Sequence, residues 1–138
     1  MDSKKFDPKK LQKLNDPNRL LDIPPGYIWD KLNLIKSDIL VDIGAGTGFF
    51  SIPFVGYTKN GKIFACDVSD IMIEWMNENI CPKYLNIVPL KMDEHTVPLE
   101  DGIADLVYMI NLHHELDSPD EMLKESFRLL RKIGRAHV

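Results

Sequence analysis

Residues 39–48 read Ile-Leu-Val-Asp-Ile-Gly-Ala-Gly-Thr-Gly, a short apolar run followed by glycine at alternate positions. The apolar part predicts a strand buried on both faces, as in parallel sheets. Gly44, Gly46 and Gly48 allow a sharp turn and let a ligand lie against the main chain. The free N–H groups of a following helix would face that ligand. The stretch predicts a strand, a ligand-binding turn and a helix; an ordinary tight turn is the less favoured alternative.

Strand patterns and helix patterns alternate through the rest of the chain. Further strands are expected at 62–66, 85–90 and 105–110. Helical spacing of apolar residues, or a helix start, marks 24–35, 49–55, 69–76 and 118–132. This alternation predicts the α/β class, with a Rossmann-like, doubly wound parallel sheet.

Composition sets the broad class of the protein. The 138 residues are 44% hydrophobic and 28% charged, which is typical of one soluble globular domain. No apolar run approaches the roughly 20 residues of a membrane-spanning helix. The net charge of −4 gives no overall positive field for nucleic acid. Cys66 and Cys81 form no CxxC pair, which favours a reduced, cytoplasmic setting.

The glycine spacing separates two classes of nucleotide-binding turn. In the dinucleotide fingerprint GxGxxG the third glycine would fall at Phe49, so that match fails. The spacing is instead DxGxGxG from Asp42, with Asp67 at the end of the second strand. This combination resembles the class I S-adenosylmethionine-dependent methyltransferases, in outline over residues 24–132. The patterns at 16–19 and 23–25 are similar to the small-molecule methyltransferases of ubiquinone and menaquinone biosynthesis.

The resemblance implies a function and a cofactor site. It implies methyl transfer from S-adenosylmethionine to a small-molecule acceptor, with S-adenosylhomocysteine as product. A NAD-dependent oxidoreductase and a non-catalytic fragment are the alternatives. The implied cofactor-binding residues lie at the carboxyl ends of the four strands: Asp42, Gly44, Ala45, Gly46, Thr47, Gly48, Asp67, Val68, Met72, Met92, Asp93 and Asn111. Asp67 would bind the ribose hydroxyls and Asp42 would orient the loop or meet the cofactor's amino group.

Other assignments stay open at several of these positions. Asp67 could merely cap its loop, and Asp93 could be a solvated acid in a charged loop. His113 and His114 are adjacent, and no further His or Cys lies at ligand spacing, so no metal site is expected. One of these histidines is a weak candidate for a general base near the transferred methyl group; a packed or exposed histidine is the plainer interpretation.

The C-terminal end departs from the family pattern. The resemblance implies a seven-stranded sheet, whereas only four strands are predicted here. Strand four is therefore expected at an exposed edge. Residues 133–138 could be encoded by ATC GGA AGA GCA CAC GTC, a string that resembles the start of a common sequencing adapter. The expected organisation is a lysine-rich segment at 1–23, an incomplete cofactor-binding domain at 24–132 and a non-native tail at 133–138. A natural short terminus is the alternative for the tail.

Overall fold

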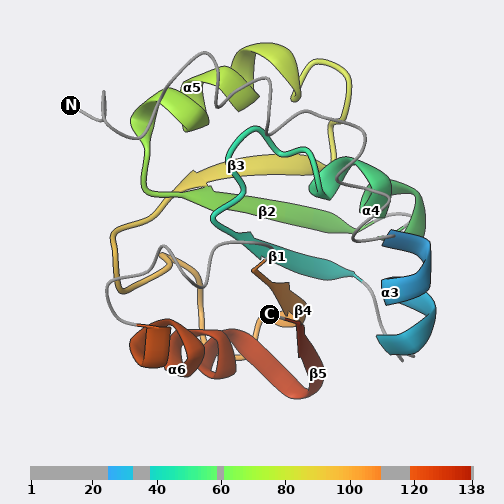
Figure 1. The fold of residues 1–138 in the computed structure, drawn as a ribbon, viewed down its shortest axis with the longest axis vertical. Coiled ribbons are helices and arrows are strands. Elements are labelled where there is room, and N and C mark those ends of the chain that lie inside the picture. Colours follow the sequence, from blue (N-terminus) through green and yellow to red (C-terminus); the bar gives the residue numbers. More distant parts are fainter. Residues whose placement is uncertain (1–24, 33–37, 59–60, 110–118, 138) are drawn as a thin grey trace.

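The computed structural model describes residues 25–32, 38–58, 61–109 and 119–137. Its five strands form one parallel sheet in the order β3-β2-β1-β4-β5 (Figure 1). The strands are β1 Ile39–Ile43, β2 Lys62–Asp67, β3 Ile87–Lys91, β4 Ala104–Tyr108 and β5 Leu130–His137. This arrangement confirms the α/β parallel-sheet prediction.

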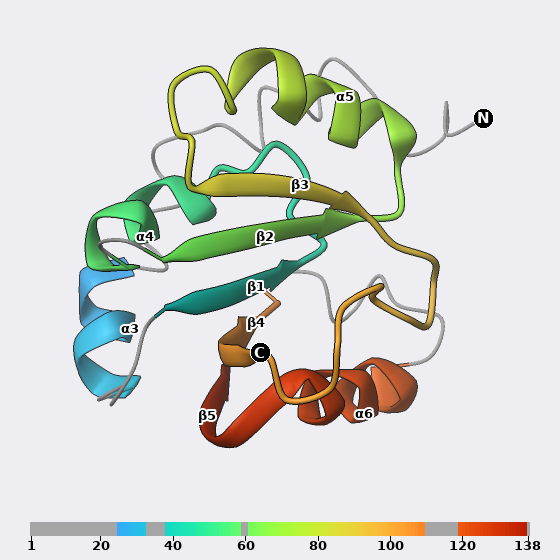
Figure 2. The same ribbon diagram turned by 180° about the vertical axis from the view of Figure 1, so that it is seen from behind.

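Helices cover both faces of the sheet. They are α3 Pro25–Leu32, α4 Ser51–Thr58, α5 Asp70–Asn79 and α6 Pro119–Leu129. Figures 1 and 2 show α6 on the opposite side of the sheet from α4 and α5. None of the helices within the described segments is long and apolar enough to cross a membrane.

The alternation of side chains along β1 builds a core on each face. Val41 and Ile43 pack in one apolar cluster with Met122 of α6. Leu40 packs in the other cluster with Phe54 of α4 and with residues of α3 and α5. Because successive side chains of a strand point to opposite faces, a continuous apolar run supplies both cores.

The helix that follows β2 begins where the sequence predicts. Ser69 is the N-cap of α5, and its hydroxyl accepts a hydrogen bond from the Met72 amide at 3.3 Å. Such a cap satisfies one of the helix's unpaired N–H groups. Only Val68 lies between the last residue of β2, Asp67, and this N-cap.

The expectation that the sheet lacks strands after the fourth is wrong. β5 pairs parallel to β4, with Ala104 opposite Leu130 and Val107 opposite Ala136. The pairing uses main-chain N–H and C=O groups, so it does not need the apolar run by which buried strands are recognised. α6 accordingly ends at Leu129, and β4 is an inner strand. The suggestion that residues 133–138 are non-native concerns their origin and stays a prediction.

Candidate functional site

The glycine turn after β1 is anchored on the neighbouring strand. The amides of Gly44 and Ala45 both donate to the Cys66 carbonyl, at 2.8 and 2.9 Å. Gly44, Gly46 and Gly48 have φ values of 74°, 61° and 78°. This left-handed region of backbone conformation is disfavoured for residues that have a Cβ, so the turn requires glycine at these positions.

Asp67 reaches across to this turn from the end of β2. Its Oδ2 accepts a hydrogen bond from the Gly46 amide at 2.8 Å, and its Oδ1 accepts from the Ser69 amide at 2.9 Å. The two strands are parallel neighbours with Ile43 opposite Cys66, so their carboxyl ends share one edge. The structure therefore brings together the two motifs that carry the predicted site, and fixes the orientation of the Asp67 carboxylate.

Asp42 lies in the interior beneath the same turn. Its side chain is 3% exposed, and its Oδ2 accepts from the Ser51 hydroxyl at 2.7 Å. The Ser51 oxygen also lies 2.9 Å from the Tyr108 hydroxyl. Sequence reasoning missed Ser51 and Tyr108. A signal was available, since Tyr108 puts a hydroxyl at the end of the buried strand β4 and Ser51 begins the helix after the turn.

These carboxylates set the electrostatics of the site. Burial raises the pKa of the Cys66 thiol, and the nearby charges of Asp42 and Asp67 raise it further. Burial also raises the pKa of Tyr108 well above its ordinary value, with Asp42 as the next cause. Both groups therefore stay protonated near neutral pH.

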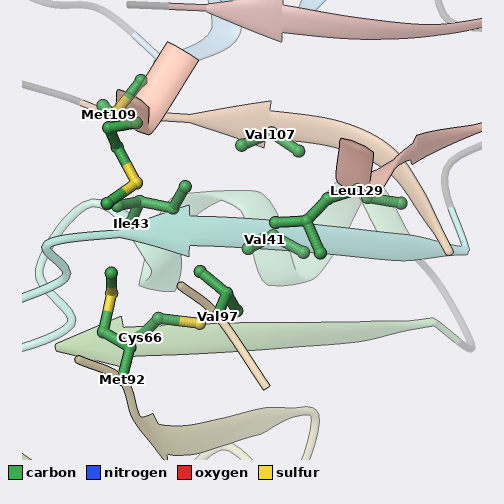
Figure 3. Packing of buried hydrophobic residues seen from close by; sticks show 10 residues of the cluster. Val41, Ile43, Cys66, Met92, Val97, Val107, Met109 and Leu129 are labelled. Atoms are coloured by element: carbon green, nitrogen blue, oxygen red, sulfur yellow. The ribbon is translucent and has the colours of Figure 1, made fainter. Parts of the chain in front are cut away.

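The residues expected around the adenine differ in their exposure. Met72 and Met92 are each 4% exposed, and Met92 packs beside Cys66 and Val97 in the cluster of Figure 3. The Met92 amide donates to the Asp67 carbonyl at 3.0 Å, which ties the end of β3 to the site. Val68 is half-buried against the same cluster.

Asp93 is exposed and bonded within its own loop. Its carboxylate accepts from the amides of His95 and Thr96 and from the Thr96 hydroxyl, at 2.9, 2.7 and 2.7 Å. These hydrogen bonds, with that from the Thr96 hydroxyl largest, hold the Asp93 pKa below its ordinary value. The geometry matches the solvated-acid alternative, and adenine recognition by Asp93 stays a prediction.

The remaining candidates fall partly outside the described residues. Asn111, His113 and His114 lie in 110–118, which the structure does not describe, so their roles stay predictions. Thr47 is buried, and Gly48 packs against Met76 of α5. Within the described segments, no three His, Cys, Asp or Glu side chains group as a metal site would need.

Comparison with known families gives this geometry a context. A family model described as "Methyltransferase domain" matches residues 40–134, which include the glycine turn, both aspartates and β4. The chain belongs to this methyltransferase family. The assignment confirms the predicted resemblance, and it gives no support to the oxidoreductase alternative.

Two methyltransferases of known structure have a similar fold. A SAM-dependent methyltransferase from Aquifex aeolicus is 31% identical with a TM-score of 0.81, over 91% of this chain and 68% of that one. The structure of a putative S-adenosylmethionine-dependent methyltransferase from Methanococcus maripaludis is 25% identical, with a TM-score of 0.76, over 93% of this chain and 59% of that one.

Curated relatives carry different activities in their names. A tRNA(Phe) (4-demethylwyosine(37)-C(7)) aminocarboxypropyltransferase from Methanocaldococcus jannaschii is 33% identical over 65% of this chain and 37% of its own length. A demethylmenaquinone methyltransferase from Chlamydia muridarum is 27% identical over 88% of this chain and 53% of its own. The chain thus spans roughly a third to a half of these two relatives.

Proposed function

We propose that the chain binds S-adenosylmethionine at the carboxyl edge of β1 and β2 and transfers its methyl group to a small-molecule acceptor. The observation that carries the proposal is the Gly46–Asp67 hydrogen bond, which joins the glycine turn to an oriented carboxylate. Open α/β sheets bind ligands at this edge of the strands.

The residues at this site fit the chemical groups of S-adenosylmethionine. The Asp67 carboxylate presents two acceptor oxygens in a fixed orientation, which suits the paired hydroxyls of a ribose. The glycine turn exposes main chain where the methionine part would lie, with Asp42 at its start. Val68 and Met72 on one side, and Met92 and Asp93 on the other, would flank the adenine.

The residues of the chain would contribute mainly orientation. When bound, the cofactor supplies a sulfonium whose methyl group is already electrophilic. Holding donor and acceptor in line is potentially worth about 7–11 kcal/mol. Asn111 is proposed to line the transfer side, and His113 or His114 would serve as a base only where the acceptor must lose a proton.

The acceptor and the transferred group are separate questions. The acidic net charge favours a small molecule over nucleic acid, as does the named substrate of the menaquinone relative. The tRNA relative is named for an aminocarboxypropyl group instead. Loss of a methyl group from S-adenosylmethionine leaves S-adenosylhomocysteine, whereas loss of an aminocarboxypropyl group leaves methylthioadenosine. The chain can be incubated with S-adenosylmethionine and either a demethylated quinone or tRNA. S-adenosylhomocysteine as product then indicates methyl transfer, and methylthioadenosine indicates aminocarboxypropyl transfer. A cytoplasmic location is part of the proposal.

Ligand-dependent unfolding tests the cofactor assignment. S-adenosylhomocysteine at a hundredfold excess over its Kd should stabilise the chain by about 2.7 kcal/mol, and NAD should leave its Tm unchanged. Asp67→Ala should weaken S-adenosylhomocysteine binding by about 1.5–3 kcal/mol, the usual range for hydrogen bonds to a charged group. Glu78→Ala, an exposed acid of α5, is the matched control. A Tm that only NAD raises, or that neither ligand moves, would refute the assignment.

A further inference from the structure

We propose that Ser51 and Tyr108 are positioning residues that hold Asp42 toward the amino-acid end of the cofactor. The inference rests on the proposed function, and it concerns residues outside the glycine motif. The three side chains come from three elements, β1, α4 and β4, and meet in the interior. They are 3%, 0% and 1% exposed for Asp42, Ser51 and Tyr108.

The direction of the hydrogen bonds follows from the count of hydrogens. A serine hydroxyl has one hydrogen to donate, and Ser51 gives it to Asp42 Oδ2 at 2.7 Å. The contact of 2.9 Å between Ser51 Oγ and the Tyr108 hydroxyl must therefore be donated by Tyr108. The chain runs from Tyr108 through Ser51 to the carboxylate, so Tyr108 acts on Asp42 only through Ser51.

This network is placed to act on one end of the cofactor. Asp42 precedes the glycine turn by two residues, where the methionine part is proposed to lie. Asp67, proposed for the ribose, is held separately by the amides of Gly46 and Ser69. Loss of the Ser51 or the Tyr108 hydroxyl should therefore weaken binding of the amino-acid end of the cofactor. Binding of the adenosine end should be unaffected. A network that only stabilised the fold would not discriminate between the two ends.

Calorimetric titration of two ligands provides the test. S-adenosylhomocysteine carries the amino-acid end, whereas methylthioadenosine keeps adenosine and sulfur but lacks it. We expect Ser51→Ala and Tyr108→Phe to weaken S-adenosylhomocysteine binding, Ser51→Ala by about tenfold, while methylthioadenosine affinity stays within about twofold. Because Tyr108 acts through Ser51, the double variant should lose no more S-adenosylhomocysteine affinity than Ser51→Ala alone.

The matched control is Thr58→Val, which removes another buried hydroxyl from the same helix. Thr58 Oγ1 donates to the Val55 carbonyl within α4, so the change should leave both affinities unaltered. Equal weakening of both ligands in Ser51→Ala and Tyr108→Phe, or unchanged S-adenosylhomocysteine affinity, would overturn the inference. If Ser51→Ala does not fold, Tyr108→Phe decides by the same criterion. Absence of S-adenosylhomocysteine binding by the unaltered chain would instead refute the proposed function.

Discussion

Arg131 at the start of β5 donates from Nη1 to the buried Asp105 Oδ1 of β4, at 2.8 Å. The other oxygen of Asp105 accepts from the amides of Asp38 and Ile39, at 2.9 and 3.0 Å. One carboxylate therefore joins the beginnings of β1, β4 and β5. Because it is only 4% exposed, its charge depends on these partners for compensation.

Arg131→Met should lower the free energy of unfolding by about 1.5–3 kcal/mol, because Asp105 loses its charged donor. Urea denaturation followed by circular dichroism measures the change. Lys124→Met removes an exposed cation from α6 and should shift the free energy by no more than about 0.5 kcal/mol. Equal effects of the two substitutions would mean that the Asp105 contact contributes no stability of its own.

A pair of glycine substitutions isolates the backbone requirement of the turn. Gly48 has a φ of 78°, and an added Cβ would lie 3.3 Å from Met76 Sδ. Gly48→Ala should therefore destabilise by about 1–2 kcal/mol from the left-handed conformation alone. Gly56, within α4, has open space around its Cβ position. Gly56→Ala should be neutral or stabilising by up to about 1 kcal/mol. Thermal unfolding of both variants compares them, and equal destabilisation would contradict the argument.

The sequence was sufficient for the parts of the site that depend on strand order. An apolar run before Gly44 and an acid at the end of the next strand must meet at one edge once the strands are parallel neighbours. The Gly46–Asp67 hydrogen bond follows from that logic. The Asp42–Ser51–Tyr108 network did not, because Tyr108 and Ser51 are 57 residues apart and only the packing of β4 beside β1 brings them together.

The fifth strand was missed for a different reason. The helical pattern predicts a helix to residue 132, and residues 133–138 are expected to be a non-native tail, which leaves no segment for a strand where the structure has β5. Its register also shifts between Ala104 and Leu106, where the two strands advance unequally. Such an irregularity leaves no simple pattern in a single sequence.

Arg128 joins α6 to the loop that precedes β4. Its guanidinium donates to the carbonyls of Val97 and Leu99, each at 2.9 Å, and to the Glu125 and Asp101 carboxylates. Arg128→Met should destabilise the chain by about 2–4 kcal/mol, because it leaves the buried Glu125 carboxylate without its cation. Urea unfolding measures this change, with Lys83→Met at an exposed position as the control. A loss below about 0.5 kcal/mol would show that water replaces the guanidinium.

The ion pair of Arg128 and Glu125 predicts how the free energy of unfolding depends on pH. Hydrogen bonds from Arg128 hold the Glu125 pKa below its ordinary value of 4.5, against the opposing effect of burial. The unfolded chain therefore takes up this proton first as the pH falls. The stability from Glu125 is fully present above about pH 4.5 and is lost as the pH falls through the native pKa. Glu125→Gln lacks this titration, so its deficit relative to the unaltered chain should shrink on acidification. Urea unfolding from about pH 7 to about pH 3.5 measures both proteins, and a deficit that stays constant across that range would contradict the prediction.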